Sequence, residues 1–308
     1  MRILLGLTSV TAALLLAGCT AAPRASTAAP QTTGVTPARS TGSVPASTIA
    51  LGSPVPTRVP LSSKPAARPS ATGLPTGSAT SHPATATRPP ADTVIVLNPG
   101  HNGADAAHTA ELRRQVPAGF GQYKDCETTG TETNAGFPEH AFNWDVSLRV
   151  RALLQARGVR VIMTRDSDTG FGPCVDQRAR TGNQAGVAAV VSIHADGAAT
   201  TGHGFHVCED SRQPAGAAVA AASHRLTVAM HDALLHGSGM TVSSYLGTNG
   251  YFPRDDLAGL NLATVPATFL EIGNMRNGGD AAIQTSAAGR QRIAEAVAAG
   301  ILSWLGRR

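Results

Sequence analysis

The sequence predicts an α/β fold: a single domain with a mostly parallel central sheet flanked by helices, preceded by a disordered tether. Three observations predict it. Short β-branched runs alternate with longer helical runs between residues 93 and 305, which is the pattern of a parallel sheet covered by helices. All 12 aromatic residues lie after position 92. Residues 1–91 contain no Asp or Glu and 13 of the 20 prolines, so they lack the apolar surface that a core requires.

Residues 1–19 have the pattern of a lipoprotein-type signal peptide. Arg2 supplies the positive start, and residues 3–17 are mostly apolar but too short to span a membrane comfortably. The closing Leu-Ala-Gly-Cys, which ends at Cys19, resembles the bacterial lipobox, in which the Cys receives a diacylglyceryl group. Two acyl chains would give a stable anchor, so we expect an exported protein, lipid-anchored at the outer face of the cytoplasmic membrane or cell wall. The alternative is a plain signal peptide and a secreted protein.

Residues 20–91 are rich in Pro, Ala, Ser and Thr and are predicted to form a disordered linker. The charge divides at the same boundary. The formal net charge is +5, with seven bases before residue 92 and 18 bases against 20 acids from residue 92 on. The part that folds is therefore slightly acidic, which argues against a nucleic-acid-binding domain. Residues 92–308 are long enough for one domain with a substantial core.

The elements of the domain follow from local patterns. The β-branched run after Asp92 ends at an Asn-Pro-Gly turn, and a polar, Gly-rich stretch without a predicted element extends to about Phe137. The first helix shows an apolar side and ends at Gly158. The third strand is nearly all apolar, as a strand buried on both faces would be. The expected strands are 93–97, 159–164, 187–193, 204–208 and 267–272, and the expected helices are 141–157, 175–184, 215–235 and 287–305.

Ionisable side chains gather at the ends of three of these strands. His101 follows the first strand, His194 ends the third and Glu271 ends the last, while Glu139 opens the first helix. Ligand sites of parallel sheets lie beyond the carboxyl ends of the strands, so we expect these side chains on one rim. Two imidazoles and a carboxylate form a familiar catalytic zinc set, and a further carboxylate could take a proton from water. The composition of the site favours a hydrolase.

Simpler interpretations of the same residues exist. A histidine at a strand end is often a structural hydrogen-bonding residue. Glu139 alone would be explained as an acid favoured by the dipole at a helix N-terminus. Glu271 is harder to dismiss, because it lies in an apolar strand where a carboxylate without a partner would be costly. The spacing by itself leaves the metal interpretation and the structural interpretation open.

Several sequence blocks, in order along the chain, carry a family resemblance. They are residues 96–103 (VLNPGHNG), 138–143 (PEHAFN), 158–165 (GVRVIMTR), 177–183 (QRARTGN), 192–196 (SIHAD) and 265–275 (VPATFLEIGNM). Together they resemble the zinc-dependent N-acetylmuramoyl-L-alanine amidases of the type-3 class, from about residue 92 to the C-terminus. Any one block would be weak evidence, whereas the ordered set is specific.

The resemblance implies a role for each candidate. His101, Glu139 and His194 would bind one zinc ion, and Glu271 would be the general base and later the acid that protonates the leaving amine. The reaction would be hydrolysis of the amide between N-acetylmuramic acid and L-alanine in peptidoglycan or muropeptides, for wall remodelling or turnover. Residues 92–308 would be the zinc amidase catalytic domain. Asn98 stands where this class usually has Asp, and Asn274 replaces a residue that is often bulkier.

Cysteine usage adds one expectation. In an exported protein Cys126 and Cys174 could form a disulfide that pins the stretch 119–137 beside the site. With Cys19 assigned to lipid, three thiols remain for one bond. We favour this pair because both residues flank the expected rim, whereas Cys208 ends a strand expected to be buried. The alternative is that all three thiols are free.

Other functions remain open from the sequence. A zinc peptidase acting on peptidoglycan stem peptides is disfavoured because no His-Glu-x-x-His string occurs. A non-catalytic wall-binding or regulatory module on the same fold is disfavoured because all four candidate residues are present. We expect a monomer that binds no nucleic acid. Arg254 is either a substrate contact or a member of an exposed ion pair. Five histidines lie in no motif and are expected at the surface or in the core: His203, His206, His224, His231 and His236.

Overall fold

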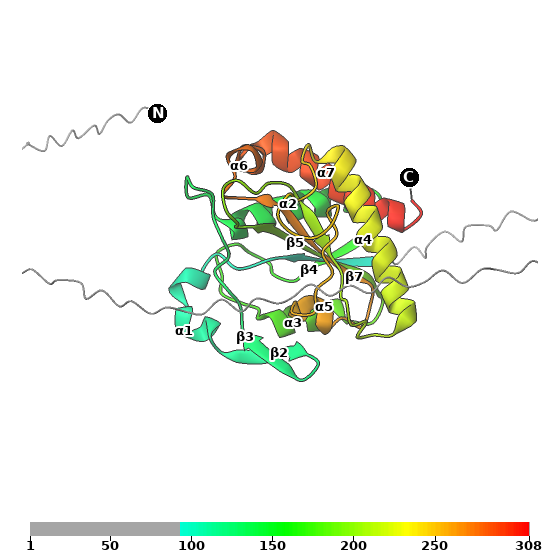
Figure 1. Cartoon of the computed structure of the whole chain (residues 1–308). Coiled ribbons are helices and arrows are strands. Elements are labelled where there is room, and N and C mark those ends of the chain that lie inside the picture. Colours follow the sequence, from blue (N-terminus) through cyan, green and yellow to red (C-terminus); the bar gives the residue numbers. More distant parts are fainter. Residues whose placement is uncertain (1–92, 308) are drawn as a thin grey trace, which may run out of the picture. The chain divides into compact units, whose positions relative to one another are not determined.

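The computed structural model describes residues 93–307, which are drawn in colour in Figure 1. The expected signal peptide of residues 1–19, its Cys19 and the expected linker of residues 20–91 lie outside the described residues. Within residues 93–307, no helix is both long enough and apolar enough to cross a membrane.

A five-stranded sheet runs through the centre of the domain (Figure 1). Its strand order is β4-β1-β5-β7-β6, and every neighbouring pair is parallel except β6 with β7. This confirms the expected mostly parallel sheet, with one antiparallel strand added at its edge. The strands are β1 (Val94–Pro99), β4 (Arg160–Met163), β5 (Val187–Asp196), β6 (His206–Cys208) and β7 (Ala267–Asn274).

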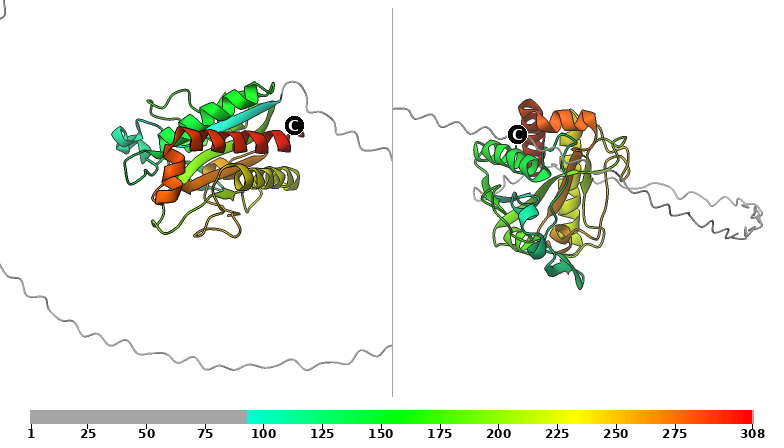
Figure 2. Two further views of the ribbon diagram at one scale, coloured as in Figure 1. Left: turned by 90° about the horizontal axis from the view of Figure 1, so that it is seen from above. Right: turned by 90° about the vertical axis from the view of Figure 1, so that its left-hand side faces the viewer.

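Helices cover both faces of the sheet. Three long helices lie side by side on one face, with α7 between α2 and α4 (Figure 2). Short helices and a β-hairpin cover the other face. The long helices are α2 (Glu139–Gln155), α4 (Ala217–Gly237) and α7 (Ala287–Trp304). The remaining elements are η1 (Asp105–Ala107), α1 (Thr109–Leu112), β2 (Gln115–Gly119), β3 (Gln122–Asp125), α3 (Val175–Gly182), α5 (Ala258–Asn261) and α6 (Gly278–Thr285).

Alternation along the strands sorts their side chains between the two faces. In β1, Ile95 and Leu97 enter the larger core under the long helices, whereas Val94 and Val96 pack into a smaller cluster on the opposite face. The same alternation holds in β7 and, after a register shift near its start, in β5 from Ala189 on. Burying each large aliphatic side chain stabilises the fold by about 1.5 to 3 kcal/mol. This burial on both faces fixes the register of the sheet.

The structure departs from the sequence-based expectations mainly between the first strand and the first helix. Residues 115–125 form the β2–β3 hairpin, although this stretch was expected to have no regular structure. Only Val116 and Ala118 of these two strands are buried, so the hydrophobic alternation is too short to be recognised. The first helix also begins earlier than expected, at Glu139 instead of residue 141. That shift makes Glu139 the first residue of α2.

Candidate active site and metal centre

The face of the sheet opposite the long helices carries the candidate residues. His194 in β5 and Glu271 in β7 are Cα partners in the parallel ladder, and Glu271 is in turn the partner of His206 in β6. Because side chains of paired residues point to the same face, these three form one row across three strands. This row stands at the carboxyl ends of the parallel strands, as expected for a ligand site.

His101 reaches the same place through a tight turn after β1. Its backbone has φ 58°, an uncommon conformation for a residue with a side chain. Gly100 lets the turn approach β5, because a Cβ atom at this position would lie 1.9 Å from Cε1 of His194. Gly130, with φ +73°, makes a second close approach, since its Cβ would lie 2.7 Å from Oε2 of Glu139. Both glycines allow backbone to pack directly against the clustered side chains.

Glu139 lies at the centre of the cluster. Its Oε2 is 3.1 Å from Nε2 of His101, and its Oε1 is 3.0 Å from Nδ1 of His194. The backbone N–H groups of Thr131 and Ala195 also donate to this carboxylate, at 3.0 and 3.2 Å. At the first position of α2 the helix dipole favours a negative charge. Burial, backbone donors and two imidazoles therefore fix the orientation of Glu139.

The two imidazoles are oriented by further contacts. Nδ1 of His101 lies 2.8 Å from the carbonyl oxygen of Thr128, which can only accept, so Nδ1 carries a proton and Nε2 is the nitrogen that faces Glu139. Glu127 lies 3.4 Å from the same Nδ1. The ring of His194 stacks on Phe269, with 4.2 Å between centroids. An imidazole whose far nitrogen bonds a carbonyl or carboxylate is the arrangement that metal ligands usually show.

The electrostatics of the cluster favour a cation. Burial alone would raise the pKa of Glu139, but His101 and His194 hold it well below its ordinary value. Burial alone would lower the pKa of His101, but Glu139 and Glu127 raise it well above its ordinary value. Burial lowers the pKa of His194. Potential ligand atoms of His101, Glu139 and His194 lie within 4.8 Å of one another, so the donor set fits a zinc ion in chemistry and in spacing.

Glu271 borders the same cavity. The cavity has a volume of about 390 Å³, and its lining includes Glu271 and the three clustered side chains. Burial raises the pKa of Glu271 well above its ordinary value, and the nearby carboxylates of Glu139 and Asp196 raise it further. Its Oε2 atom is buried and has no hydrogen-bond partner among residues 93–307. The structure thus brings all four candidates to one cavity, while their individual roles stay predictions.

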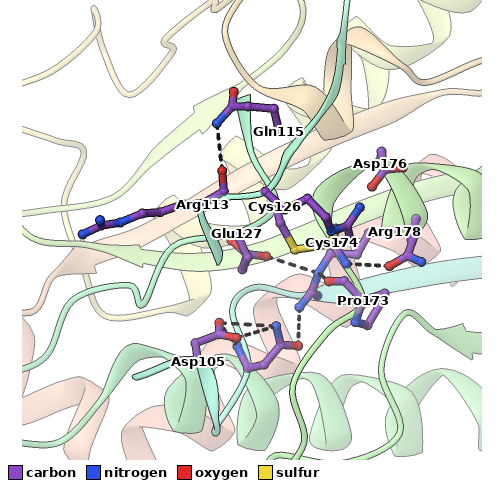
Figure 3. The surroundings of a disulfide bond; sticks show 12 residues. Asp105, Arg113, Gln115, Cys126, Glu127, Pro173, Cys174, Asp176 and Arg178 are labelled. Atoms are coloured by element: carbon purple, nitrogen blue, oxygen red, sulfur yellow. Dashed lines mark hydrogen bonds and ion pairs between the residues drawn. A yellow bond between two sulfur atoms is a disulfide. The ribbon is translucent and has the colours of Figure 1, made fainter. Parts of the chain in front are cut away.

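A buried arginine connects the turn after β1 to the loop that contains Glu127. Arg178 in α3 donates to the carbonyl oxygens of Pro99 and His101, at 2.7 and 2.8 Å. Its Nε lies 3.3 Å from Glu127. Figure 3 shows Arg178 and Glu127 beside the disulfide. Burial alone would raise the pKa of Glu127, but His101 and Arg178 lower it to about 2, so the two side chains form a buried ion pair.

The expected disulfide is confirmed. Cys126 and Cys174 are bonded, and Cys208 is a buried free cysteine. The bond joins the residue after β3 to the residue before α3, in a small cluster with Val116. It therefore fixes Glu127, the next residue after Cys126, at the cavity.

Asn98 is a structural residue in this chain. Its Oδ1 accepts from Thr164 Oγ1 at 2.7 Å and from Arg178 at 2.9 Å, and its Nδ2 donates to Ser192 Oγ at 3.0 Å. These bonds join the ends of β1, β4 and β5. The amide supplies the donor to Ser192 that an Asp could not supply.

Sequence reasoning missed several residues that hold the site. A second buried arginine, Arg165, donates to the carbonyl oxygens of Pro99 and His140 at 3.1 and 2.8 Å. Arg178 was inside a recognised block but had no assigned role. The only sequence signal for Glu127 was its place next to Cys126. Such residues act through backbone carbonyls far away in the sequence, which no local pattern reveals.

The sequence of the described domain is similar to that of known proteins. The family described as N-acetylmuramoyl-L-alanine amidase matches residues 95–303, a range that begins one residue into β1 and contains all four residues of the candidate site. The chain belongs to this amidase family. An N-acetylmuramoyl-L-alanine amidase of Mycobacterium tuberculosis, Rv3717, is 45% identical over 212 residues, which cover 69% of this chain and 86% of that protein.

Solved structures of N-acetylmuramyl-L-alanine amidases share the domain. Ami1 from Mycobacterium smegmatis is 47% identical, with a TM-score of 0.66, and the match covers 70% of this chain and 97% of that one. Ami1 from Mycobacterium abscessus is 45% identical, with a TM-score of 0.66, over 69% of this chain and 98% of that one. The recognised family and the α/β fold are therefore confirmed.

The Arg178–Glu127 pair yields a test of how the rim is held. Replacing Arg178 with Met leaves Glu127 buried without its cation, so the free energy of unfolding should fall by about 3 to 5 kcal/mol in urea titrations. Arg180 is the matched control on the same helix, because its own side chain is 65% exposed in its ion pair with Asp176. Arg180→Met should change the same quantity by less than about 0.5 kcal/mol. Equal effects of the two substitutions would contradict a special role for Arg178.

Proposed function

We propose that this chain is a zinc-dependent N-acetylmuramoyl-L-alanine amidase that cleaves the amide between the lactyl group of N-acetylmuramic acid and L-alanine of the stem peptide. The observation that carries the proposal is the buried cluster of His101, Glu139 and His194 beside Glu271 in one cavity. Family membership supports the reaction class. The residue roles and the metal are the part that goes beyond that membership.

The proposed ligands are His101, Glu139 and His194. When bound, zinc polarises the scissile carbonyl and lowers the pKa of the attacking water. The protein supplies fixed ligands, because the carboxylate of Glu139 accepts from two backbone N–H groups and the far nitrogen of His101 is committed to Thr128. Little reorganisation is needed when the cation enters, which favours tight binding.

Glu271 is the proposed proton carrier. As a water oxygen attacks the amide carbonyl carbon, a carboxylate oxygen of Glu271 accepts one proton of that water. The protonated side chain then donates this proton to the alanine nitrogen, and the carbon–nitrogen bond breaks. The products are a lactyl carboxylate on the sugar and a stem peptide with a free amino group. A carboxylate in a site of limited water access can serve both steps.

The cavity also has cationic walls. Lys124 of β3 and Arg254 both line it, together with the histidine and glutamate cluster. Arg254 pairs with Asp256 at 2.8 Å and is about a quarter exposed. The ion pair foreseen for Arg254 is therefore present, and a contact with a carboxylate of the stem peptide stays a prediction.

We further propose that the enzyme is a monomer anchored to the outer face of the cytoplasmic membrane through a lipid on Cys19. The support is the signal-like composition of residues 1–19 and the Leu-Ala-Gly-Cys string. An anchored enzyme would meet its substrate in the wall that lies above that membrane.

The reaction can be tested on defined muropeptides. Digestion should release intact stem peptides with a free N-terminal alanine and sugars that carry a free lactyl carboxylate, and a chelator should abolish both products. Mass spectrometry of the digest distinguishes them. Shortened peptides that remain attached to sugar would identify a zinc peptidase instead.

The assigned roles predict different behaviour of two variants. Glu271→Gln should retain about one zinc per chain. Its kcat should fall by a factor on the order of 10²–10⁴. His194→Ala should lose both zinc and activity, because it removes a ligand. Metal analysis by mass spectrometry, run beside the activity assay, separates the two. An active Glu271→Gln enzyme would refute its role as the base.

Anchoring predicts a change of location. Expressed in a bacterium that carries the lipoprotein pathway, the full chain should sediment with membranes and incorporate labelled fatty acid. The Cys19→Ser variant should do neither, while the purified variant keeps full activity on soluble muropeptides. Equal membrane association of the two proteins would argue against lipid on Cys19.

A further inference from the structure

His206 is a buried histidine without an explanation in the site described so far. It opens β6 and is 0% exposed. Neither ring nitrogen has a hydrogen-bond partner among residues 93–307. Buried side-chain nitrogens are almost always hydrogen-bonded, because leaving them unpaired costs free energy. A phenylalanine would fill this position without that cost, so the imidazole needs a reason.

The position of His206 next to Glu271 supplies a reason for the imidazole. Its Cα pairs with that of Glu271 in the antiparallel ladder between β6 and β7, which brings the two Cβ atoms to about 4.5 to 5.5 Å on the same face. Oε2 of Glu271 is itself buried and unpartnered within the described residues. An unpaired acceptor thus stands next to an unpaired imidazole, on adjacent strands.

Glu271 lies in the middle of its row. On the other side its Cα partner is His194 of β5, one of the proposed metal ligands. The carboxylate therefore has the metal cluster on one flank and His206 on the other. No residue within 93–307 donates a hydrogen bond to Oε2 of Glu271, and His206 is a neighbour on the next strand whose ring nitrogens have no partner there either.

We propose that His206 is a positioning residue for Glu271, whose imidazole turns to donate a hydrogen bond directly to the buried oxygen of that carboxylate, a contact that neither group makes in the structure. This inference rests on the proposed function, in which Glu271 is the base. Holding one oxygen leaves the other free to face the attacking water. The fixed carboxylate then needs no rotation before it accepts the proton, and such preorganisation lowers the barrier to reaction.

The surroundings of His206 suit a neutral donor. Burial lowers its pKa to about 4, with Asp196 opposing and Arg254 adding to the shift, so the ring carries one N–H and one lone pair. The rings of Tyr245 and Phe252 meet it edge-on, with centroids at 6.2 and 5.6 Å. These contacts hold the imidazole plane and engage neither nitrogen. The carboxylate of Asp196 accepts a hydrogen bond from the Tyr245 hydroxyl at 3.0 Å.

The competing explanation is that His206 only fills space between aromatic rings. The two explanations differ in what a substitution does. The His206→Phe substitution preserves the packing between the aromatic rings but removes the N–H that could donate a hydrogen bond. A donor role is partly restored by Gln, whose amide N–H can reach the same neighbour. Because His206 is not in the ligand cluster, neither substitution should remove the metal.

The test uses the full-length zinc-loaded enzyme with a soluble muropeptide. His206→Phe should lower kcat by about tenfold to a hundredfold, with KM and zinc content within twofold of the unsubstituted enzyme. His206→Gln should recover most of the lost kcat. The matched control is His231→Gln, another buried histidine whose nitrogens bond Asp232 and the Asn249 carbonyl, and it should leave kcat within twofold.

Distinct outcomes overturn the inference. A His206→Phe enzyme with kcat within twofold of the original shows that the imidazole only packs, and so does a His206→Gln enzyme as slow as His206→Phe. If His206→Phe does not fold, His206→Met takes its place in the comparison with His206→Gln. Glu271→Gln is measured in parallel. If that enzyme stays active the proposed base is wrong, whereas a dead Glu271→Gln with a fully active His206→Phe rejects the positioning role alone.

Discussion

The site depends on one ionised carboxylate buried at the beginning of a helix. Glu139 is only 3% exposed, so its charge must be balanced by donors and by positive charge nearby. The first turn of α2, the N–H groups of Thr131 and Ala195, and two imidazoles supply this balance. These contributors come from the turn after β1, the loop before α2, the start of α2 and the end of β5. The carboxylate therefore holds the β1 turn, the loop before α2 and the end of β5 together.

A second buried charge pair stabilises the same end of the sheet. Arg178 and Glu127 are taken out of water together, and such a pair contributes mainly by fixing structure, because desolvation offsets much of its attraction. Its guanidinium also satisfies the carbonyl oxygens that the β1 turn leaves unpaired. With the Cys126–Cys174 bond adjoining, the loop that carries Glu127 has little freedom to move away from His101.

The parts of the structure that rest on periodic patterns could be predicted from the sequence. The five strands of the main sheet and the long helices have clear apolar patterns, and the rule that sites lie at the carboxyl ends of parallel strands brought His101, His194 and Glu271 together. The β2–β3 hairpin could not be predicted, because only Val116 and Ala118 mark its buried side. The role proposed for His206 could not be predicted either, because it depends on which strand lies beside β7. That strand, β6, is antiparallel and three residues long, and nothing local sets its partner.

The direction of β1 has a consequence for how substrate is met. The described chain enters the domain at the amino end of this six-residue strand and turns into the cavity at its carboxyl end, so entrance and cavity stand roughly 20 Å apart at opposite poles. Whatever precedes residue 93 is joined to the pole that faces away from the reacting bond. A substrate that binds in the cavity therefore meets the end of the sheet opposite to Thr93, where the described chain begins.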